Sequence, residues 1–214
     1  MKLITSLKNR AELVVSAFRQ RYQKKKQKRL RNTDFSLIAS NCNGGIILHD
    51  LNLKFNTPFI NLSLPPKDFI KLAGDFEHYM ALELKELPDE TVSYPVGQLG
   101  DLRINFVHYP SFEEAKRKWD ERKQRINYNN LFFMLTEREG CTLDDLQTFD
   151  RLPMKRKVAF THKKYPSVKC AFYLRGFENS NGVGLSMHHP HFFSIKRYVD
   201  QFDFVTWVNE TESP

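Results

Sequence analysis

The sequence has few cysteines and no long apolar run. Its 214 residues include only Cys42, Cys141 and Cys170, and an odd, widely spaced set is typical of a reducing cytoplasm rather than of a disulfide framework. No apolar stretch approaches the roughly 18 residues that a membrane-spanning helix needs. The N-terminus also lacks the apolar core of a secretory signal peptide. No dinucleotide glycine fingerprint follows a predicted strand, and no Walker loop is present. We therefore expect a cytoplasmic domain without these nucleotide motifs.

Positive charge is concentrated at one end of the chain. The formal net charge is +8, but residues 1–31 hold eleven Lys/Arg and one Glu. The remainder carries 22 Lys/Arg against 24 Asp/Glu, so the body of the protein is nearly neutral. The high net charge therefore does not indicate a nucleic-acid partner for the domain.

The N-terminal segment has the pattern of an amphipathic helix. Its apolar residues recur every three or four positions, at Ile4, Leu7, Ala11, Val14, Phe18 and Tyr22. A basic run follows them, which is typical of a helix on an anionic membrane surface. Packing on its own domain or on a second copy remains an alternative, as do nucleic acid and a transit peptide. We predict a basic helix or tail over residues 1–32 and a single α/β domain over residues 33–214, with peripheral attachment at the inner face of the plasma membrane as one location.

The rest of the chain alternates apolar runs with amphipathic stretches. Strands are expected at 34–40, 58–64, 92–96, 102–107, 131–135, 157–161, 169–174 and 204–208. Helices are expected from residue 46, after Pro65-Pro66, and over 111–125, 142–149 and 193–202. This alternation predicts a three-layer α/β/α fold with a mixed, mostly parallel sheet. The turn at Gly100-Asp101 predicts an antiparallel hairpin within it.

Reactive side chains follow several of these strands. Cys42, His108, Glu137, Arg138 and His162 each come at or just after a predicted strand end. Ligands of open α/β sheets bind beyond the carboxyl ends of the strands. Parallel neighbours would gather these side chains at one edge, whereas antiparallel strands would send some of them to the other.

Cys42 is the strongest candidate nucleophile. It precedes a helix, and a helix N-terminus favours the thiolate. Gly44 and Gly45 leave backbone N–H groups that could stabilise an oxyanion, with Asn41, Glu137 and Arg138 as further substrate-binding residues. His108 or His162 would serve as the base. The alternative is a structural cysteine in a tight strand-to-helix turn.

A basic helix and a histidine-rich segment are two further candidate binding sites. The helix over 111–125 carries Arg122 and Arg125, which could hold the phosphate of a coenzyme, although a solvated face with internal ion pairs explains them too. The segment His188-His189-Pro190-His191 lacks the ligand spacing of a zinc site, so no metal is predicted.

Several short runs resemble those of one bacterial family. They are Ser40-Asn41-Cys42-Asn43-Gly44-Gly45, Asn56-Thr57-Pro58-Phe59-Ile60, Tyr94-Pro95-Val96-Gly97, Phe106-Val107-His108-Tyr109, Glu114-Ala115, Lys118-Trp119, Arg122, Arg125-Ile126-Asn127 and Gly140-Cys141-Thr142. Together they resemble the domain-of-unknown-function family nineteen-nineteen, often described as exopolysaccharide biosynthesis proteins. The likeness covers about residues 34–210 and implies an α/β/α fold encoded in capsule or exopolysaccharide loci. Family members commonly carry a large residue, often Trp, where this chain has Asn43.

The residues and the resemblance together predict a transferase of bacterial surface polysaccharide synthesis. We expect a cysteine-dependent acyltransferase that acetylates a sugar or a lipid-linked precursor, with acyl-coenzyme A as donor and no tightly bound cofactor. A glycosyl- or phosphosugar transferase of the same pathway and a non-catalytic, membrane-associated assembly protein are the alternatives.

Overall fold

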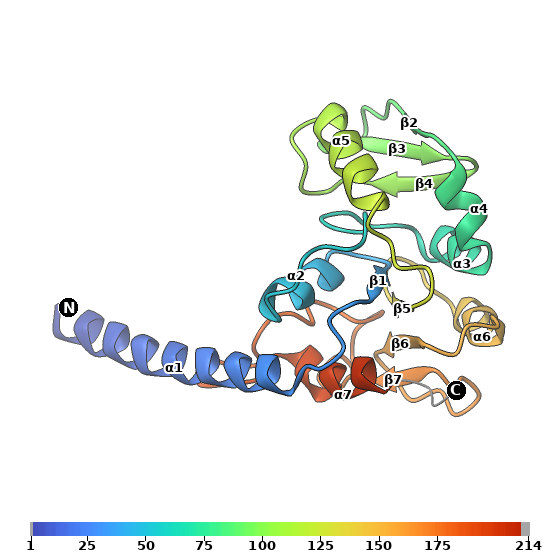
Figure 1. Cartoon of the computed structure of the whole chain (residues 1–214). Helices are drawn as coiled ribbons and strands as arrows, with labels where there is room; N and C mark the ends of the chain where they lie inside the picture. Colours follow the sequence, from blue (N-terminus) through green and yellow to red (C-terminus); the bar gives the residue numbers. More distant parts are fainter. Residues whose placement is uncertain (1, 211–214) are drawn as a thin grey trace.

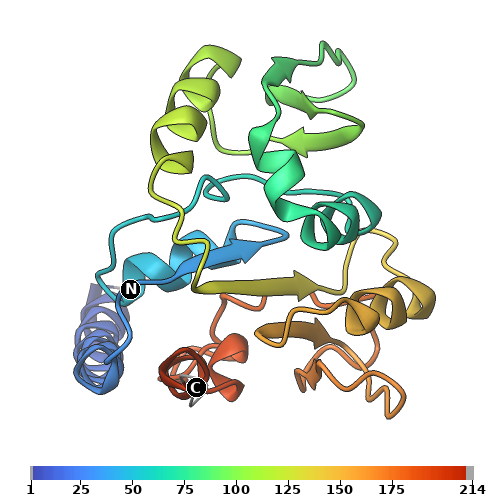
Figure 2. The same ribbon diagram turned by 45° about the vertical axis from the view of Figure 1, so that its right-hand side comes forward.

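A parallel sheet forms the centre of the protein. The structure is a computed structural model that describes residues 2–210, with side chains from Ala11 onward. Within this range sheet A has four parallel strands in the order β1-β5-β6-β7. They are β1 (Ser36–Ala39), β5 (Leu131–Thr136), β6 (Lys157–Thr161) and β7 (Ala171–Tyr173). Figure 2 shows the arrows of β1, β5 and β6 pointing the same way, so their carboxyl ends share one edge of the sheet.

Helices cover both faces of sheet A. Helices α2 (Asn43–Asp50) and α7 (Phe204–Asn209) lie on one face, and α3 (Pro66–Gly74) and α6 (Leu143–Arg151) lie on the other. Alternate strand residues supply the two cores: Leu37 and Ala39 join the first, whereas Ile38 joins the second. Strands buried on both faces need continuous apolar runs, which the sequence supplies. The predicted three-layer α/β fold is confirmed.

A second, smaller sheet extends from the α3 face. Sheet B is antiparallel, in the order β2-β3-β4. It consists of β2 (Leu84–Glu86), β3 (Val96–Leu99) and β4 (Leu102–Asn105), with α4 (Phe76–Ala81) and α5 (Phe112–Lys123) packed beside it. Gly100 has a φ of +63° between β3 and β4, as a tight hairpin requires. The predicted hairpin therefore exists, but it belongs to this separate sheet.

The basic N-terminal segment is one long helix, α1 (Lys2–Arg29). Its first turns extend away from the body, and its second half lies against the C-terminal region (Figure 1). Of the helices in residues 2–210, none combines the length and the apolar character needed to span a bilayer. The predicted N-terminal helix is confirmed, with one side docked on the domain.

Residues 204–208 form a helix rather than the predicted closing strand. The Asp203 side chain accepts a hydrogen bond from the Thr206 N–H at 3.2 Å and so caps α7. This cap outweighs the β-branched and aromatic residues that suggested a strand. The helix predicted over residues 193–202 shrinks to one short 3-10 turn, η1 (Tyr198–Gln201).

Residues 58–64 form no strand, contrary to expectation. Their backbone hydrogen bonds run to both sheets: Leu64 N–H donates to the Ser40 carbonyl, and Ser63 pairs with Asn105 of β4. The segment therefore bridges sheets A and B and belongs to neither. The strand predicted over residues 92–96 begins only at Val96.

Candidate functional site

The carboxyl edge of sheet A gathers most of the predicted site residues. Cys42 follows β1, Glu137 and Arg138 follow β5, and His162 follows β6. These strands are parallel neighbours, with Ala39 paired to Met134 and Thr136 paired to Phe160. The same edge of an α/β sheet is where ligands bind.

A buried carboxylate organises this edge. One oxygen of Glu137, Oε2, accepts a hydrogen bond from the backbone N–H of His162 at 2.9 Å. The other oxygen, Oε1, accepts one from the Tyr165 hydroxyl at 2.6 Å. Burial, and then this hydrogen bond, raises the pKa of Tyr165 to about 12. Tyr165 therefore stays neutral and acts as a donor to the carboxylate.

The same carboxylate lies beside the imidazole of His162. The Nδ1 atom is 2.7 Å from Glu137 Oε2, although the ring direction is not that of an aligned hydrogen bond. Both side chains are almost fully buried. A carboxylate next to Nδ1 favours the tautomer with its proton there, which leaves the lone pair on Nε2. Because Nε2 has no hydrogen-bond partner among the described residues, its lone pair can accept a proton from a bound ligand.

The turn after β1 is held by asparagine side chains. Asn41 Oδ1 accepts a hydrogen bond from the Asn43 N–H at 3.0 Å. Asn43 in turn donates from Nδ2 to the hydroxyl of Ser186 at 3.0 Å, and all three residues are buried. Ser186 thus ties a distant loop to the start of α2 through Asn43. Asn43 is the position where the family resemblance implies a larger side chain.

Cys42 does not show the lowered pKa expected of a helix N-terminus. Burial raises the pKa of its thiol, and the charge of Arg138 offsets this only in part. Across the described chain, neither His108 nor His162 forms a hydrogen bond with this thiol. Strands β1 and β6 flank β5, which separates their backbones by roughly 10 Å. The thiol and the imidazole therefore belong to one edge but form no contact pair.

Gly44 and Gly45 are buried in α2 for reasons of packing. A Cβ at Gly44 would lie 2.6 Å from the Cβ of Ala39, and one at Gly45 would lie 3.3 Å from a methyl of Ile60. Neither glycine has a positive φ. They let the helix approach β1 closely, and their predicted oxyanion role stays a prediction.

Unsatisfied polar atoms mark this edge. Asn41 Nδ2, Thr136 Oγ1 and His162 Nδ1 are buried and have no hydrogen-bond partner among the described residues. They follow or end β1, β5 and β6, three adjacent strands. An unsatisfied buried polar group costs about 1–3 kcal/mol, so each such atom calls for a partner such as water or a ligand. Three further atoms of this kind among the described residues, in Gln23, Trp119 and Arg156, lie outside this edge.

The glycine-rich loop over residues 177–187, to which the sequence prediction gave no role in the site, packs against this edge. Gly182 has a φ of +153°, and a Cβ there would lie 2.7 Å from the Glu137 carbonyl oxygen. The next residue, Val183, donates its N–H to that same carbonyl at 2.6 Å. Only glycine permits this approach. Tyr165, Ser186 and Gly182 are thus site residues that sequence reasoning missed, and the glycine-rich composition of the loop was their only signal.

The remaining predicted residues lie elsewhere. His108 is exposed in the turn after β4 of sheet B. Arg122 donates to the Tyr109 hydroxyl at 2.7 Å, and Arg125 pairs with Glu121. Both arginines have partners within the chain, so their role as phosphate ligands stays a prediction.

A groove beside the end of β7 offers other cations. Arg175, Lys196 and Arg197 line it together with Phe193 and Tyr198. The Arg197 guanidinium pairs with Asp50 at 2.5 Å, whereas Arg175 and Lys196 are exposed. This groove presents positive charge close to the carboxyl edge, which the sequence did not reveal.

The family of the chain follows from a direct comparison. The family model described as "Domain of unknown function (DUF1919)" matches residues 14–209. The chain belongs to the DUF1919 family. A DUF1919 relative is an uncharacterized protein of Haemophilus influenzae (strain ATCC 51907 / DSM 11121 / KW20 / Rd), 46% identical over 183 residues, which cover 86% of this chain and 88% of the relative.

The DUF1919 match begins earlier than the resemblance suggested. It starts at residue 14 rather than near residue 34. The structure gives a physical reason, because α1 docks on the body from Val15 onward. The docked half of α1 is therefore part of the family domain.

Proposed function

We propose that this DUF1919 protein is a transferase of bacterial surface polysaccharide synthesis, with its active site at the carboxyl edge of sheet A. One observation carries the proposal: Glu137 Oε2 accepts a hydrogen bond from the His162 backbone N–H and lies 2.7 Å from the Nδ1 atom of the same residue, at the ends of adjacent parallel strands, while Nε2 has no hydrogen-bond partner among the described residues. This arrangement suits proton abstraction from a sugar hydroxyl.

The chemistry that fits best is direct acyl transfer. In this step the sugar oxygen attacks the thioester carbonyl of an acyl-coenzyme A, its proton passes to His162 Nε2, and the coenzyme leaves as the thiol after taking up that proton. The raised pKa of Cys42 argues against a covalent acyl-cysteine as the main route. Arg138, whose charge acts on Cys42 and which pairs with Glu139 at 3.0 Å, would stabilise developing negative charge.

The groove at the end of β7 supports a donor that carries phosphate. Arg175 and Lys196 are exposed there and could bind the phosphates of a coenzyme. A nucleotide sugar would fit the same cations, so glycosyl transfer is the second candidate. A lipid-linked acceptor would place the reaction at the inner face of the plasma membrane.

An assay with purified protein tests the proposed acyl transfer. Acetyl-coenzyme A and a panel of sugars and nucleotide sugars are supplied, and the release of free coenzyme thiol is measured. We expect His162→Gln to lower turnover by about 10²–10⁴-fold, as is usual for loss of a general base. Glu137→Gln should lower it less while keeping the Tyr165 hydrogen bond, and His108→Gln is the matched control.

Cys42→Ala separates the two acyl-transfer routes. Direct transfer predicts that this variant keeps most of its turnover. Equal losses in Cys42→Ala and His162→Gln, with an acetylated Cys42 found by mass spectrometry, would establish the covalent route instead. Turnover that is unchanged in His162→Gln would refute the proposed site.

A further inference from the structure

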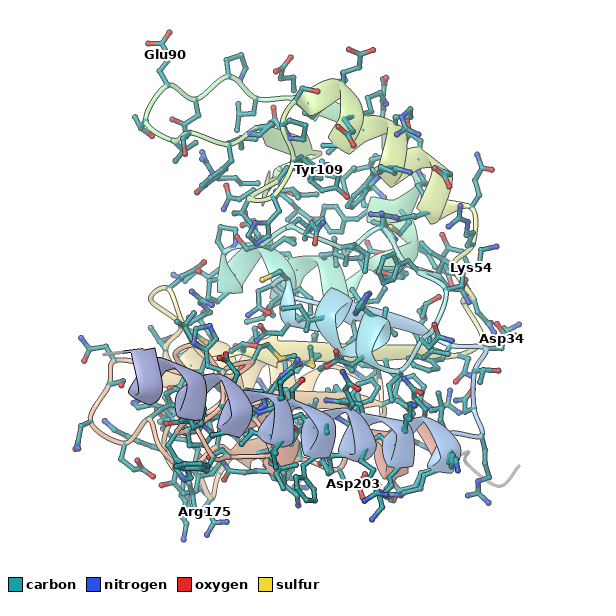
Figure 3. All side chains as sticks on the ribbon, turned by 90° about the vertical axis from the view of Figure 1, so that its left-hand side faces the viewer. Asp34, Lys54, Glu90, Tyr109, Arg175 and Asp203 are labelled. Atoms are coloured by element: carbon teal, nitrogen blue, oxygen red, sulfur yellow. The ribbon has the colours of Figure 1, made fainter. Side chains whose placement is uncertain are left out.

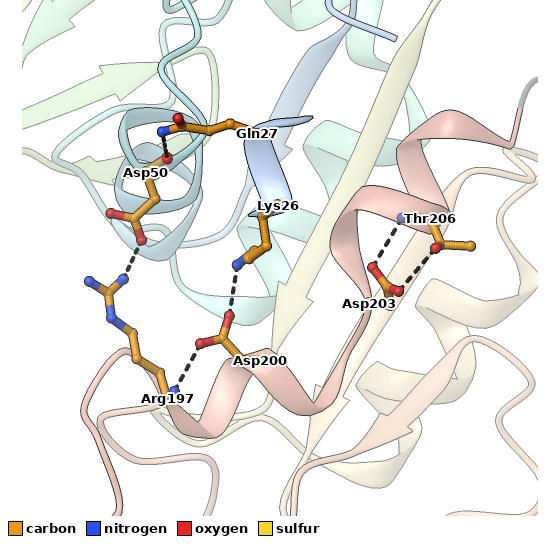
Figure 4. Close-up of polar contacts among 7 residues, drawn as sticks. All are labelled: Lys26, Gln27, Asp50, Arg197, Asp200, Asp203 and Thr206. Atoms are coloured by element: carbon orange, nitrogen blue, oxygen red, sulfur yellow. Dashed lines mark hydrogen bonds and ion pairs between the residues drawn. The ribbon is translucent and has the colours of Figure 1, made fainter. Parts of the chain in front are cut away.

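One side of α1 is committed to the body of the protein. Val15 is buried, and Arg19 donates to the carbonyls of Ser194 and Phe192 at 3.0 and 2.8 Å. Lys26 binds Asp200 at 2.7 Å. These positions recur every three or four residues and so lie on one side of the helix. Figure 4 shows the Lys26 contact beside the Asp203 cap of α7.

The next side of the helix carries a different stripe. Val14, Phe18, Arg21, Lys25 and Lys28 recur with the same spacing, displaced by one residue and therefore by about 100° around the helix. All five are exposed. Leu13 and Lys24 are exposed on the adjoining side of the helix, and we call all seven residues the outward stripe. In Figure 3 α1 runs across the front of the body, where such a stripe is accessible.

The outward stripe is apolar at one end and basic at the other. Leu13, Val14 and Phe18 are 72%, 56% and 49% exposed, which is unusual for large apolar side chains on neighbouring turns. Arg21, Lys24, Lys25 and Lys28 have no ion-pair partner among the described residues. The docking aspartates, Asp200 and Asp203, neutralise other cations of the helix.

A second apolar element lies beside the helix. Phe193 is 69% exposed and stands between the two carbonyls that Arg19 binds. Its side chain therefore emerges next to α1, although the two segments are far apart in sequence. Phe193 also lines the cationic groove at the end of β7.

We propose that the outward stripe of α1, with Phe193 beside it, is a docking surface for an anionic lipid bilayer. Exposed apolar side chains can enter the interface while the cations contact lipid phosphates. A second copy of the chain would bring like charges together, and a nucleic acid would leave the apolar residues in water. This proposal rests on the membrane location given with the proposed function. With α1 on the bilayer, the cationic groove that Phe193 lines would lie near a lipid-linked precursor.

Vesicle sedimentation with the full chain tests this surface. Vesicles of phosphatidylethanolamine with phosphatidylglycerol are compared with vesicles of phosphatidylcholine alone. We expect binding only to the anionic vesicles. The combined change Arg21→Gln, Lys24→Gln, Lys25→Gln and Lys28→Gln should weaken it on the order of 10²–10³-fold. The matched control replaces four exposed lysines on other elements, Lys54, Lys67, Lys163 and Lys169, with glutamine and should bind like the wild type.

A second variant tests the apolar half. Phe18→Ser with Phe193→Ser should weaken binding at high salt, where the cations are screened. Circular dichroism checks that each variant is folded. Equal binding by the stripe variant and the wild type, an equal loss in the control, or sedimentation without vesicles through self-association would overturn the proposal.

The chemistry and the docking can fail separately. His162→Gln should bind vesicles like the wild type even though its turnover is strongly lowered. The stripe variant should still act on a water-soluble acceptor. If the wild type does not bind anionic vesicles, the docking surface is refuted and the active-site proposal is unaffected.

Discussion

Two ion pairs attach α1 to the C-terminal region, and the structure predicts very different contributions from them. Lys26 and Asp200 are 2.7 Å apart with side chains only 13% and 3% exposed. Arg29 and Asp203 are 2.5 Å apart, but both side chains are 51% exposed. The two cations lie one turn apart on one helix, so burial is the main difference between the pairs.

Lys26→Met should therefore destabilise the protein far more than Arg29→Met. Removing one partner of a buried pair costs about 3–5 kcal/mol. Asp200 keeps a hydrogen bond from the Arg197 N–H at 2.8 Å, which reduces our expectation to about 2–3 kcal/mol. An exposed pair contributes about 0–1 kcal/mol, which bounds the loss in Arg29→Met.

Urea unfolding followed by the intrinsic fluorescence of the two tryptophans, one of which is Trp207 in α7, measures both losses. Adding Asp200→Asn to Lys26→Met should recover part of the loss, since a neutral amide needs no counter-charge. A loss in Arg29→Met that matches or exceeds that in Lys26→Met would refute the reasoning from burial.

Three further predictions follow from the same structure. Burial and then the charges of Asp200 and Asp203 raise the pKa of Tyr22 to about 12, above its usual 10.0. The contribution of Tyr22 to stability is therefore full below pH 10 and is lost as the pH rises toward 12. Comparing the unfolding of Tyr22→Phe with that of the wild type across this pH range measures the contribution. Because burial raises the pKa of Cys42, iodoacetamide should alkylate this thiol more slowly than free cysteine, and Arg138→Gln should slow it further, as peptide mapping would show. Gly44→Ala should cost about 1–3 kcal/mol through overpacking, whereas Gly45→Ala, its matched control, should change little because the gain in helix propensity offsets a milder contact.

The apolar patterns in the sequence were sufficient to predict the four strands of sheet A, but not that β2, β3 and β4 form a separate sheet. Lys157–Thr161 forms β6 over the predicted residues, because a continuous apolar run bounded by polar residues has few alternatives in a parallel sheet. Residues 204–208 show the limit of such reasoning. Their pattern fits a strand equally well, and a single capping contact from Asp203 decides for a helix.

The candidate site could be predicted only in part for a related reason. The predicted strand ends correctly put Cys42, Glu137 and His162 at one edge of the sheet, because the carboxyl ends of parallel neighbouring strands lie at the same edge. Which of them meet depends on strand order, since β5 lies between β1 and β6. The sequence does not encode that order in any local pattern. Tyr165 lies beyond a strand end altogether and enters the site through a turn.

Glu137 has a structural and a catalytic interpretation, and its contacts distinguish them. As a structural link, it needs only to accept hydrogen bonds from the His162 N–H and from the Tyr165 hydroxyl. A glutamine has one acceptor oxygen, so it could accept only one of these hydrogen bonds and would have to donate to the Tyr165 hydroxyl. A purely structural role does not explain why Glu137 Oε2 also lies 2.7 Å from His162 Nδ1. Both side chains are buried, where a charged group is costly. The two hydrogen bonds offset much of that cost, and we propose that the negative charge also acts on the imidazole by fixing its tautomer. On this proposal, the unpaired atoms of Asn41 and Thr136 at neighbouring strand ends lie where a substrate binds.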